Sequence, residues 1–152
     1  MEIDKKILES KILIVDDDIE VGMTLEEVLR DNDYHRVRYI SDPREAAPAY
    51  QEFHPDLVML DIRMPHLDGF GVLRGLRMDE TLRPIPVVVL SAAASVWEQR
   101  DGWEAGADAY VVKPFLPDAL VGTVEWVAGM SFGERLRHRE RILSFIAAQR
   151  VS

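Results

Sequence analysis

Five side chains suited to phosphoryl chemistry follow apolar, strand-like runs of this sequence. Asp16, Asp17 and Asp61 come directly after such runs, and so do Ser91 and Lys113. In an open parallel sheet the ligand site lies outside the carboxyl ends of the strands, so residues far apart in the chain meet there. Neighbouring carboxylates repel one another unless a cation offsets them, and Mg²⁺ prefers oxygen ligands. The pattern therefore predicts a magnesium site beside a hydroxyl and an amine.

Asp61 is the best candidate nucleophile, because a carboxylate can attack phosphorus to give a mixed anhydride. Lys113 would neutralise charge on the phosphoryl oxygens opposite the metal, and Ser91 could donate a hydrogen bond to one of them. Taken singly, a lysine at a strand end is usually solvated, a serine there usually caps a helix, and an aspartate run is usually a solvated loop. Their joint placement favours the functional interpretation.

The strands expected to position these residues alternate with helices along the chain. Five short apolar runs bounded by charged or turn residues predict buried strands at 11–15, 36–40, 57–60, 87–90 and 109–112. The segments between them have helical spacing, with Asp18 and Asp42 as expected N-caps and Pro48 expected to kink or shorten the second helix. The fourth helix is expected to run through Val96 and Trp103. This alternation predicts an α/β fold with a doubly wound parallel sheet.

Composition limits the function classes. The chain has 152 residues, 47% of them hydrophobic, which suits one domain with a real core. Its net charge of -9 argues against direct nucleic-acid binding. Zero cysteines exclude disulfides and fit a reducing compartment, and no segment has the roughly 20 apolar residues needed to span a bilayer. We expect a cytoplasmic protein without a membrane partner.

The last segment departs from the alternating pattern and changes the sign of the charge. Residues 131–152 carry five arginines against two glutamates. Ser131 to Glu134 resembles a capping box, and Leu136, Leu143 and Ile146 could line one helical face. Two interpretations stay open: a surface helix packed on the domain or frayed from it, and a linker helix that pairs with another chain or leads to an output module. We therefore divide the chain into an N-terminal extension (1–10), a domain (11–128) and a helical extension or linker (129–152).

Four segments, in order, resemble the motifs of response-regulator receiver domains, the CheY-like modules of two-component signal transduction. They are Ile14–Asp17, Leu60–Gly69, Leu90–Ala92 and Gly106–Phe115. The similarity runs from about Lys11 to about Ala128. It is specific because four motifs occur in order, whereas any one of them alone would be weak. It implies the flavodoxin-like five-stranded sheet with strand order 2-1-3-4-5, in which the first and third strands are neighbours.

The resemblance also assigns roles at the predicted metal site. It implies that Asp61 is the phosphoacceptor and that Asp16 and Asp17 hold Mg²⁺ together with Asp61. The backbone carbonyl of Arg63 would complete the protein's share of the metal shell. The Lys113–Pro114 bond is implied to be cis.

Further roles implied by the resemblance concern the phosphoryl group and a switch. Ser91 and Lys113 would bind the phosphoryl group, and Tyr110 would change rotamer as Ser91 moves toward it. This would couple the site to the output face, formed by the fourth and fifth helices and the fifth strand. The alternative for Tyr110 is a side chain at the sheet edge with its hydroxyl in water. Trp97 and Trp103 are expected near the output face and partly exposed.

The resemblance implies that the protein is a signalling phosphoprotein. It would not be an enzyme with a separate substrate, although it would catalyse its own phosphorylation and dephosphorylation. Expected partners are a sensor histidine kinase or phosphotransfer protein, a downstream protein or fused output domain, and a second copy of the chain. One alternative is a receiver fragment of a larger hybrid kinase, cyclase or transcription regulator. Another is a phosphohydrolase of the haloacid-dehalogenase type, which usually carries an acid two residues after the nucleophile; Arg63 stands there instead.

Overall fold

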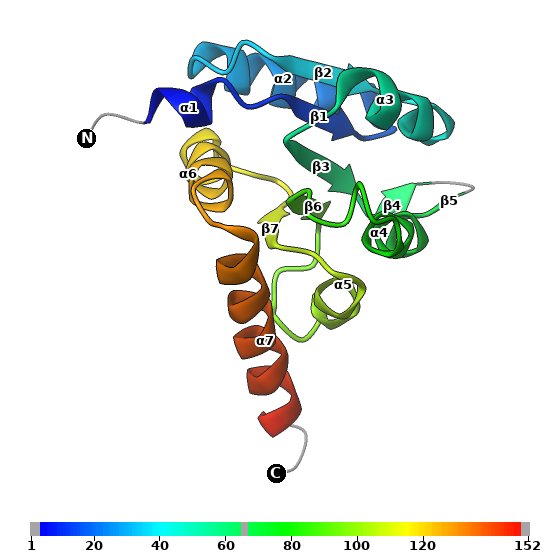
Figure 1. The fold of residues 1–152 in the computed structure, drawn as a ribbon, viewed down its shortest axis with the longest axis vertical. Helices are drawn as coiled ribbons and strands as arrows, with labels where there is room; N and C mark the ends of the chain where they lie inside the picture. Colours follow the sequence, from blue (N-terminus) through cyan, green and yellow to red (C-terminus); the bar gives the residue numbers. More distant parts are fainter. Residues whose placement is uncertain (1–3, 65–66, 150–152) are drawn as a thin grey trace.

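The computed structural model describes residues 4–64 and 67–149, and its centre is one parallel sheet (Figure 1). The order of its strands is β2-β1-β3-β6-β7, which confirms the predicted order 2-1-3-4-5. Their bounds are β1 Ile12–Val15, β2 Val37–Ile40, β3 Leu57–Asp61, β6 Val87–Ser91 and β7 Ala109–Val112. Helices cover both faces, so the doubly wound α/β fold is confirmed as well.

Each face of the sheet has its own apolar core. In β1, Ile12 and Ile14 pack under helices α2 and α6, whereas Leu13 and Val15 face α3, α4 and α5. All four side chains are fully buried, because successive strand residues point to opposite faces and both faces are covered. The helices are α1 Lys5–Leu8, α2 Ile19–Asp31, α3 Ala46–Phe53, α4 Gly69–Met78, α5 Arg100–Ala105, α6 Pro117–Ala128 and α7 Phe132–Gln149.

Two helices begin later than the sequence suggested. Asp42 caps only a 3₁₀ turn, Pro43–Glu45, and α3 starts at Ala46. Pro48 therefore lies in the first helical turn, where its missing amide donor is not needed. α5 starts at Arg100, because Val96 lies in a turn that precedes it. A two-stranded hairpin that was not predicted, β4 (Arg63–Met64) with β5 (Leu67–Asp68), joins β3 to α4.

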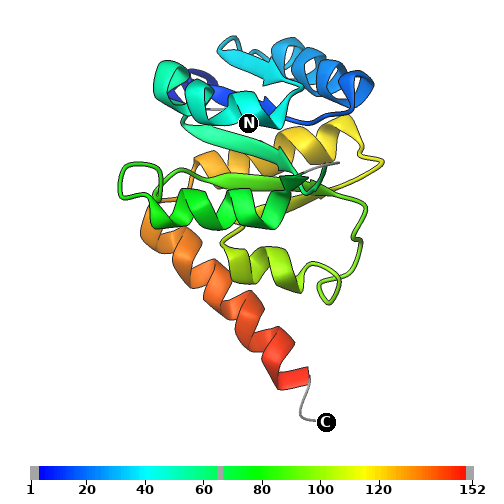
Figure 2. The ribbon, with the colours of Figure 1, turned by 90° about the vertical axis from the view of Figure 1, so that its right-hand side faces the viewer.

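The C-terminal segment forms α7, which continues from the end of α6 and runs past α5 (Figures 1 and 2). Its capping box is as predicted: the Glu134 amide donates to Ser131 Oγ at 3.1 Å, and the Ser131 amide donates to Glu134 Oε1 at 3.0 Å. The predicted apolar face is only partly right, since Ile146 is buried while Leu136 and Leu143 are half-buried. Across residues 4–64 and 67–149, no helix has the length and apolar character needed to cross a membrane.

Candidate functional site

Three carboxylates meet at the carboxyl edge of the sheet. One oxygen from each of Asp16, Asp17 and Asp61 lies within 4.8 Å of the others. Strand pairing causes this: β1 and β3 run side by side with Val15 opposite Leu60, so the residues that follow meet at one edge. Asp16 is fully buried and Asp61 is 5% exposed. Their chemistry and spacing suit a hard, oxygen-seeking cation such as Mg²⁺.

Lys113 places its ammonium group between two of these acids. Its Nζ donates to Asp16 Oδ2 at 2.9 Å and lies 3.6 Å from Asp61 Oδ2. Burial alone would lower the pKa of Lys113, but its hydrogen bond to Asp16 and the charges of Asp16 and Asp61 outweigh that effect and raise the pKa. The ammonium is therefore charged at neutral pH and stands where a phosphoryl oxygen bound to Asp61 would need a counter-charge.

Asp61 is the acid whose proton affinity changes most. Burial, together with the charge of Asp16, raises the pKa of Asp61 to about 7, against the opposing effects of Lys113 and the Arg63 amide. Without a metal ion, this carboxyl group is thus close to half-protonated at neutral pH. A divalent cation would favour the charged form, which is the nucleophilic one.

Short backbone contacts hold the acids in place. Asp16 Oδ1 accepts a hydrogen bond from the Asp18 amide at 2.9 Å, and Asp61 Oδ1 accepts one from the Arg63 amide at 3.1 Å. Pairing of Arg63 with Asp68 in the β4–β5 hairpin keeps this backbone beside Asp61. The Arg63 side chain is exposed, so only its backbone belongs to the cluster.

Ser91 lies at the same edge, one residue beyond the position paired with Asp61. It ends β6, is 6% exposed, and its Oγ accepts a hydrogen bond from the Ala93 amide at 3.0 Å. The Ser91 carbonyl accepts a hydrogen bond from the Lys113 amide at 2.8 Å, and this backbone contact holds the two residues next to each other. The Lys113–Pro114 bond that follows is cis, as the resemblance implied. The sheet therefore brings together all five side chains singled out from the sequence.

Tyr110 leaves the sheet toward α5. Its hydroxyl donates to the Gln99 carbonyl at 3.1 Å, and its ring centroid lies 5.7 Å from that of Trp103. The hydroxyl is thus held by protein and does not lie in water at an open sheet edge. Trp97 is 48% exposed, as expected, but the expectation for Trp103 is wrong: it is only 5% exposed, because Tyr110 and α7 enclose it.

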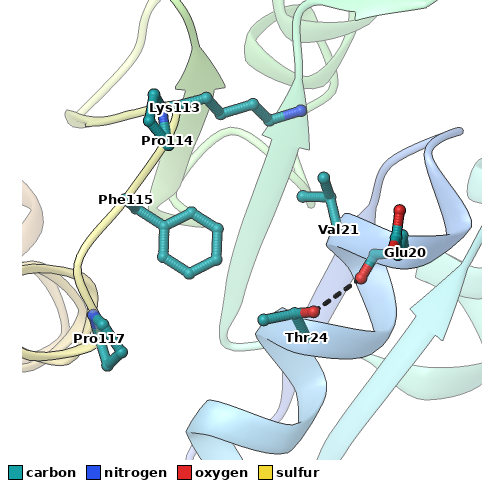
Figure 3. A pocket seen from close by; sticks show the side chains of 7 residues that line it. All are labelled: Glu20, Val21, Thr24, Lys113, Pro114, Phe115 and Pro117. Atoms are coloured by element: carbon teal, nitrogen blue, oxygen red, sulfur yellow. Dashed lines mark hydrogen bonds between the residues drawn. The ribbon is translucent and has the colours of Figure 1, made fainter.

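An open cavity adjoins the acidic cluster on the Lys113 side (Figure 3). It measures about 520 Å³ and lies between α2 and the loop that joins β7 to α6. Its lining is mostly apolar, and the figure shows Phe115 facing Val21 across it. The residues that line it are Glu20, Val21, Thr24, Lys113, Pro114, Phe115 and Pro117.

Sequence analysis missed one residue that supports the site. Tyr39, on the edge strand β2, donates its hydroxyl to the Asp16 carbonyl at 2.7 Å and so fixes the loop that carries the acids. Gly22 makes this possible, because a β-carbon there would overlap the Tyr39 ring. The signal in the sequence was a glycine inside an otherwise regular helix, where glycine is unfavourable.

Comparison with known proteins agrees with the fold and the site. The response regulator receiver domain family matches residues 12–125. A probable transcriptional regulator ycf27 of Cyanophora paradoxa is 45% identical over 120 residues, which are 79% of this chain and 47% of that protein. The transcriptional regulatory protein PrrA of Mycobacterium tuberculosis is 43% identical over 123 residues, 80% of this chain and 51% of that one. The chain thus spans about half the length of these relatives.

Solved structures show the same architecture. Chemotaxis response regulator CheY4 of Vibrio cholerae superimposes with a TM-score of 0.73 at 31% identity, covering 78% of this chain and 98% of that one. The receiver domain of sensor histidine kinase PA1611 from Pseudomonas aeruginosa has a TM-score of 0.71 at 29% identity, with coverage of 80% and 99%. Its structure holds a magnesium ion in the active site cleft.

A flavodoxin-like sheet whose carboxyl edge gathers acids, a hydroxyl and a lysine defines a class of phosphoacceptor modules. This chain belongs to the response regulator receiver domain family. Receiver domains bind Mg²⁺ at an acidic pocket, and the cluster of Asp16, Asp17 and Asp61 fits that description.

The Tyr39 contact predicts a loss of metal affinity. Replacing Tyr39 with Phe removes the hydrogen bond to the Asp16 carbonyl and should weaken Mg²⁺ binding about two- to tenfold, the usual worth of one such bond. Isothermal titration calorimetry with MgCl₂ measures this. Tyr34→Phe is the matched control, because the Tyr34 hydroxyl is buried with no hydrogen-bond partner among the described residues. Equal Mg²⁺ affinity in Tyr39→Phe and the control would show that the hydroxyl does not position the loop.

Proposed function

We propose that this protein is a receiver that accepts a phosphoryl group on Asp61 from a histidine of a sensor kinase or phosphotransfer protein, in a Mg²⁺-dependent reaction. The observation that carries the proposal is the convergence of the Lys113 ammonium with the buried carboxylates of Asp16 and Asp61. A carboxylate nucleophile needs cations on the phosphoryl oxygens, and this edge of the sheet supplies one and can bind another.

The chain's own groups divide the reaction among them. An Asp61 oxygen attacks phosphorus, the phosphorus–nitrogen bond to the donor imidazole breaks, and the imidazole nitrogen keeps the electron pair. Lys113 neutralises one phosphoryl oxygen, and the Ser91 hydroxyl donates a hydrogen bond to another. Asp16, Asp17, Asp61 and the Arg63 carbonyl would hold the Mg²⁺, which when bound neutralises the remaining phosphoryl charge.

A phosphatase acting on a separate substrate is less favoured. Such an enzyme needs an acid close to the nucleophile to protonate the leaving alcohol. The corresponding position is Arg63, whose exposed side chain cannot donate in that way. We therefore propose a signalling domain that catalyses only its own phosphorylation and dephosphorylation.

The donor should dock over the cavity beside Lys113. Three large apolar side chains are exposed on the two elements that form its walls: Ile19 and Met23 on α2 are 59% and 62% exposed, and Leu116 before α6 is 73% exposed. Exposed apolar residues around a charged site suit the binding of a donor helix in which apolar residues surround one phosphorylated histidine. Specificity for the kinase would then reside in α2 and the β7–α6 loop.

Phosphorylation would be read out through Ser91 and Tyr110. As Ser91 turns toward the phosphoryl group, Tyr110 would leave its contact with the Gln99 carbonyl and change the surface of α5, β7 and α6. The partner that recognises that surface would be a downstream protein, a fused output domain or a second copy of the chain. We place this signalling in the cytoplasm, where Mg²⁺ and kinase domains are available.

The proposed chemistry predicts phosphorylation from a small donor. Incubation with acetyl phosphate and Mg²⁺ should add one phosphoryl group to Asp61, because the site itself supplies the groups that stabilise the transition state. Mass spectrometry locates the label, with Asp61→Asn and a metal-free sample as controls. Label that persists in Asp61→Asn, or that does not need Mg²⁺, would contradict the proposed site.

The docking proposal predicts a variant that separates partner recognition from chemistry. Met23→Gln should slow phosphotransfer from a phosphohistidine kinase domain about tenfold while the rate with acetyl phosphate stays unchanged, because Met23 is expected to contact only the protein donor. Met78→Gln is the matched control, since Met78 is 82% exposed at the end of α4 that lies away from the site. Transfer rates are measured with radiolabelled kinase. Equal rates for both variants would refute docking on α2.

A further inference from the structure

Helix α7 rests on a surface made by α5, β7 and α6, which we call the α7-docking surface. At its centre the His138 ring packs edge-on against Trp126, with centroids 4.7 Å apart, and against Trp103, at 5.8 Å. Farther along α7, the ring centroid of Phe145 lies 5.9 Å from that of Trp97. Aromatic side chains from α5, α6 and the turn before α5 therefore form the surface on which α7 packs.

Asp108 anchors the same helix through charge. This residue, immediately before β7, has a side chain that is 1% exposed. Its Oδ1 accepts from Arg139 of α7 at 2.8 Å and lies 3.5 Å from the Arg135 Nε, while Oδ2 accepts from Arg77 of α4 at 2.7 Å. Arg139 also donates to the Ala107 carbonyl at 2.9 Å. The Asp108 carboxylate thus forms ion pairs with three guanidinium groups, two of them from α7.

This kind of docking is specific but reversible. Three cations share one buried anion, and burying ion pairs costs desolvation energy that the attraction offsets only in part. Two arginines and a histidine make several of the inner contacts of α7, where a permanent core helix would carry leucine, and Ile146 is its one buried aliphatic side chain among the described residues. The ion pairs therefore determine where α7 docks but contribute only modestly to the stability of the docked state.

The docking surface is physically continuous with the phosphorylation site. Strand β7 and its flanks carry Asp108 at one end and Lys113 at the other, with Tyr110 between them. The Tyr110 ring contacts Trp103, the same side chain that supports His138 of α7. Gly102 provides the space for Tyr110 on α5, since a β-carbon there would overlap the Tyr110 hydroxyl. Any movement of Tyr110 therefore changes the support of α7.

We infer that the α7-docking surface binds α7 when Asp61 is unmodified and releases it when Asp61 is phosphorylated. The inference rests on the proposed function, because it takes the movement of Tyr110 as the signal. Loss of the Tyr110 ring behind Trp103 weakens the packing of His138 against Trp103 and, with it, the docking of α7. Release of α7 exposes Trp103 and Trp126 to partner proteins, and α7 itself can then bind a partner. By thermodynamic reciprocity, weakening α7 docking must also favour the phosphorylated state.

Hydrogen–deuterium exchange of the full chain tests this inference. Beryllofluoride with Mg²⁺ serves as the probe, because it mimics a phosphoryl group on an aspartate. Addition of the probe should speed exchange of α7 amides about fivefold or more, the range of ordinary coupling energies, and should slow exchange around Asp61. Arg139→Gln should speed α7 exchange without the probe and raise beryllofluoride affinity. Arg137→Gln, an exposed arginine on the same helix, should behave as wild type.

The outcomes separate the two proposals. Slower exchange around Asp61 with unchanged or slower exchange in α7 would overturn the inference and leave the proposed function standing. No change around Asp61 would refute the proposed function and the inference together. Equal behaviour of Arg139→Gln and Arg137→Gln would show that Asp108 does not hold α7.

Discussion

Two carboxylates, those of Asp16 and Asp61, are buried side by side against a single ammonium group. Half-buried Asp17 adds a third negative charge within 4.8 Å. Lys113 does not balance this cluster: burial, together with the charge of Asp16, raises the pKa of Asp61 to about 7 despite the nearby ammonium group. The excess of negative charge is what makes the edge of the sheet a site for a divalent cation and, with the cation, for a phosphoryl group. The strand order serves this arrangement, because only neighbouring β1 and β3 can bring the acids together.

Strand β7 links that cluster to the rest of the molecule. Lys113 follows its carboxyl end and contacts the acids, Tyr110 in its middle packs on α5, and Asp108 before its amino end holds two arginines of α7. One short strand and the residues that flank it thus connect the acidic cluster, the proposed switch residue Tyr110 and the C-terminal helix α7. Of the two interpretations that the sequence left open for this segment, the structure shows the helix packed on the domain. Its contacts combine aromatic packing with ion pairs to the buried Asp108.

The sequence predicted the sheet and the acidic cluster well, because both follow from local patterns. Apolar runs that end in Asp16, Asp61, Ser91 and Lys113 identify strands, and parallel strands necessarily share a carboxyl edge. Features that depend on pairs distant in sequence were missed. The Tyr39 hydroxyl reaches Asp16 because Gly22 leaves space, and Trp103 is buried because Tyr110 and α7 enclose it. The pairing of Arg135 and Arg139 of α7 with Asp108 likewise joins residues that are distant in the sequence.

The account depends most on the charge imbalance at Asp61, and urea denaturation of wild type and Asp61→Asn at pH 5 and pH 8 tests it directly. The folded-state pKa of Asp61, about 7, lies above its unfolded value of about 4, so the folded protein binds the extra proton between these pH values and loses stability as pH rises through them. At pH 8 without metal, Asp61→Asn should be more stable than wild type by at least about 1 kcal/mol. The difference should shrink at pH 5, and Mg²⁺ at pH 8 should stabilise wild type far more than the variant. Equal stabilities at both pH values, with no selective effect of Mg²⁺, would contradict the account.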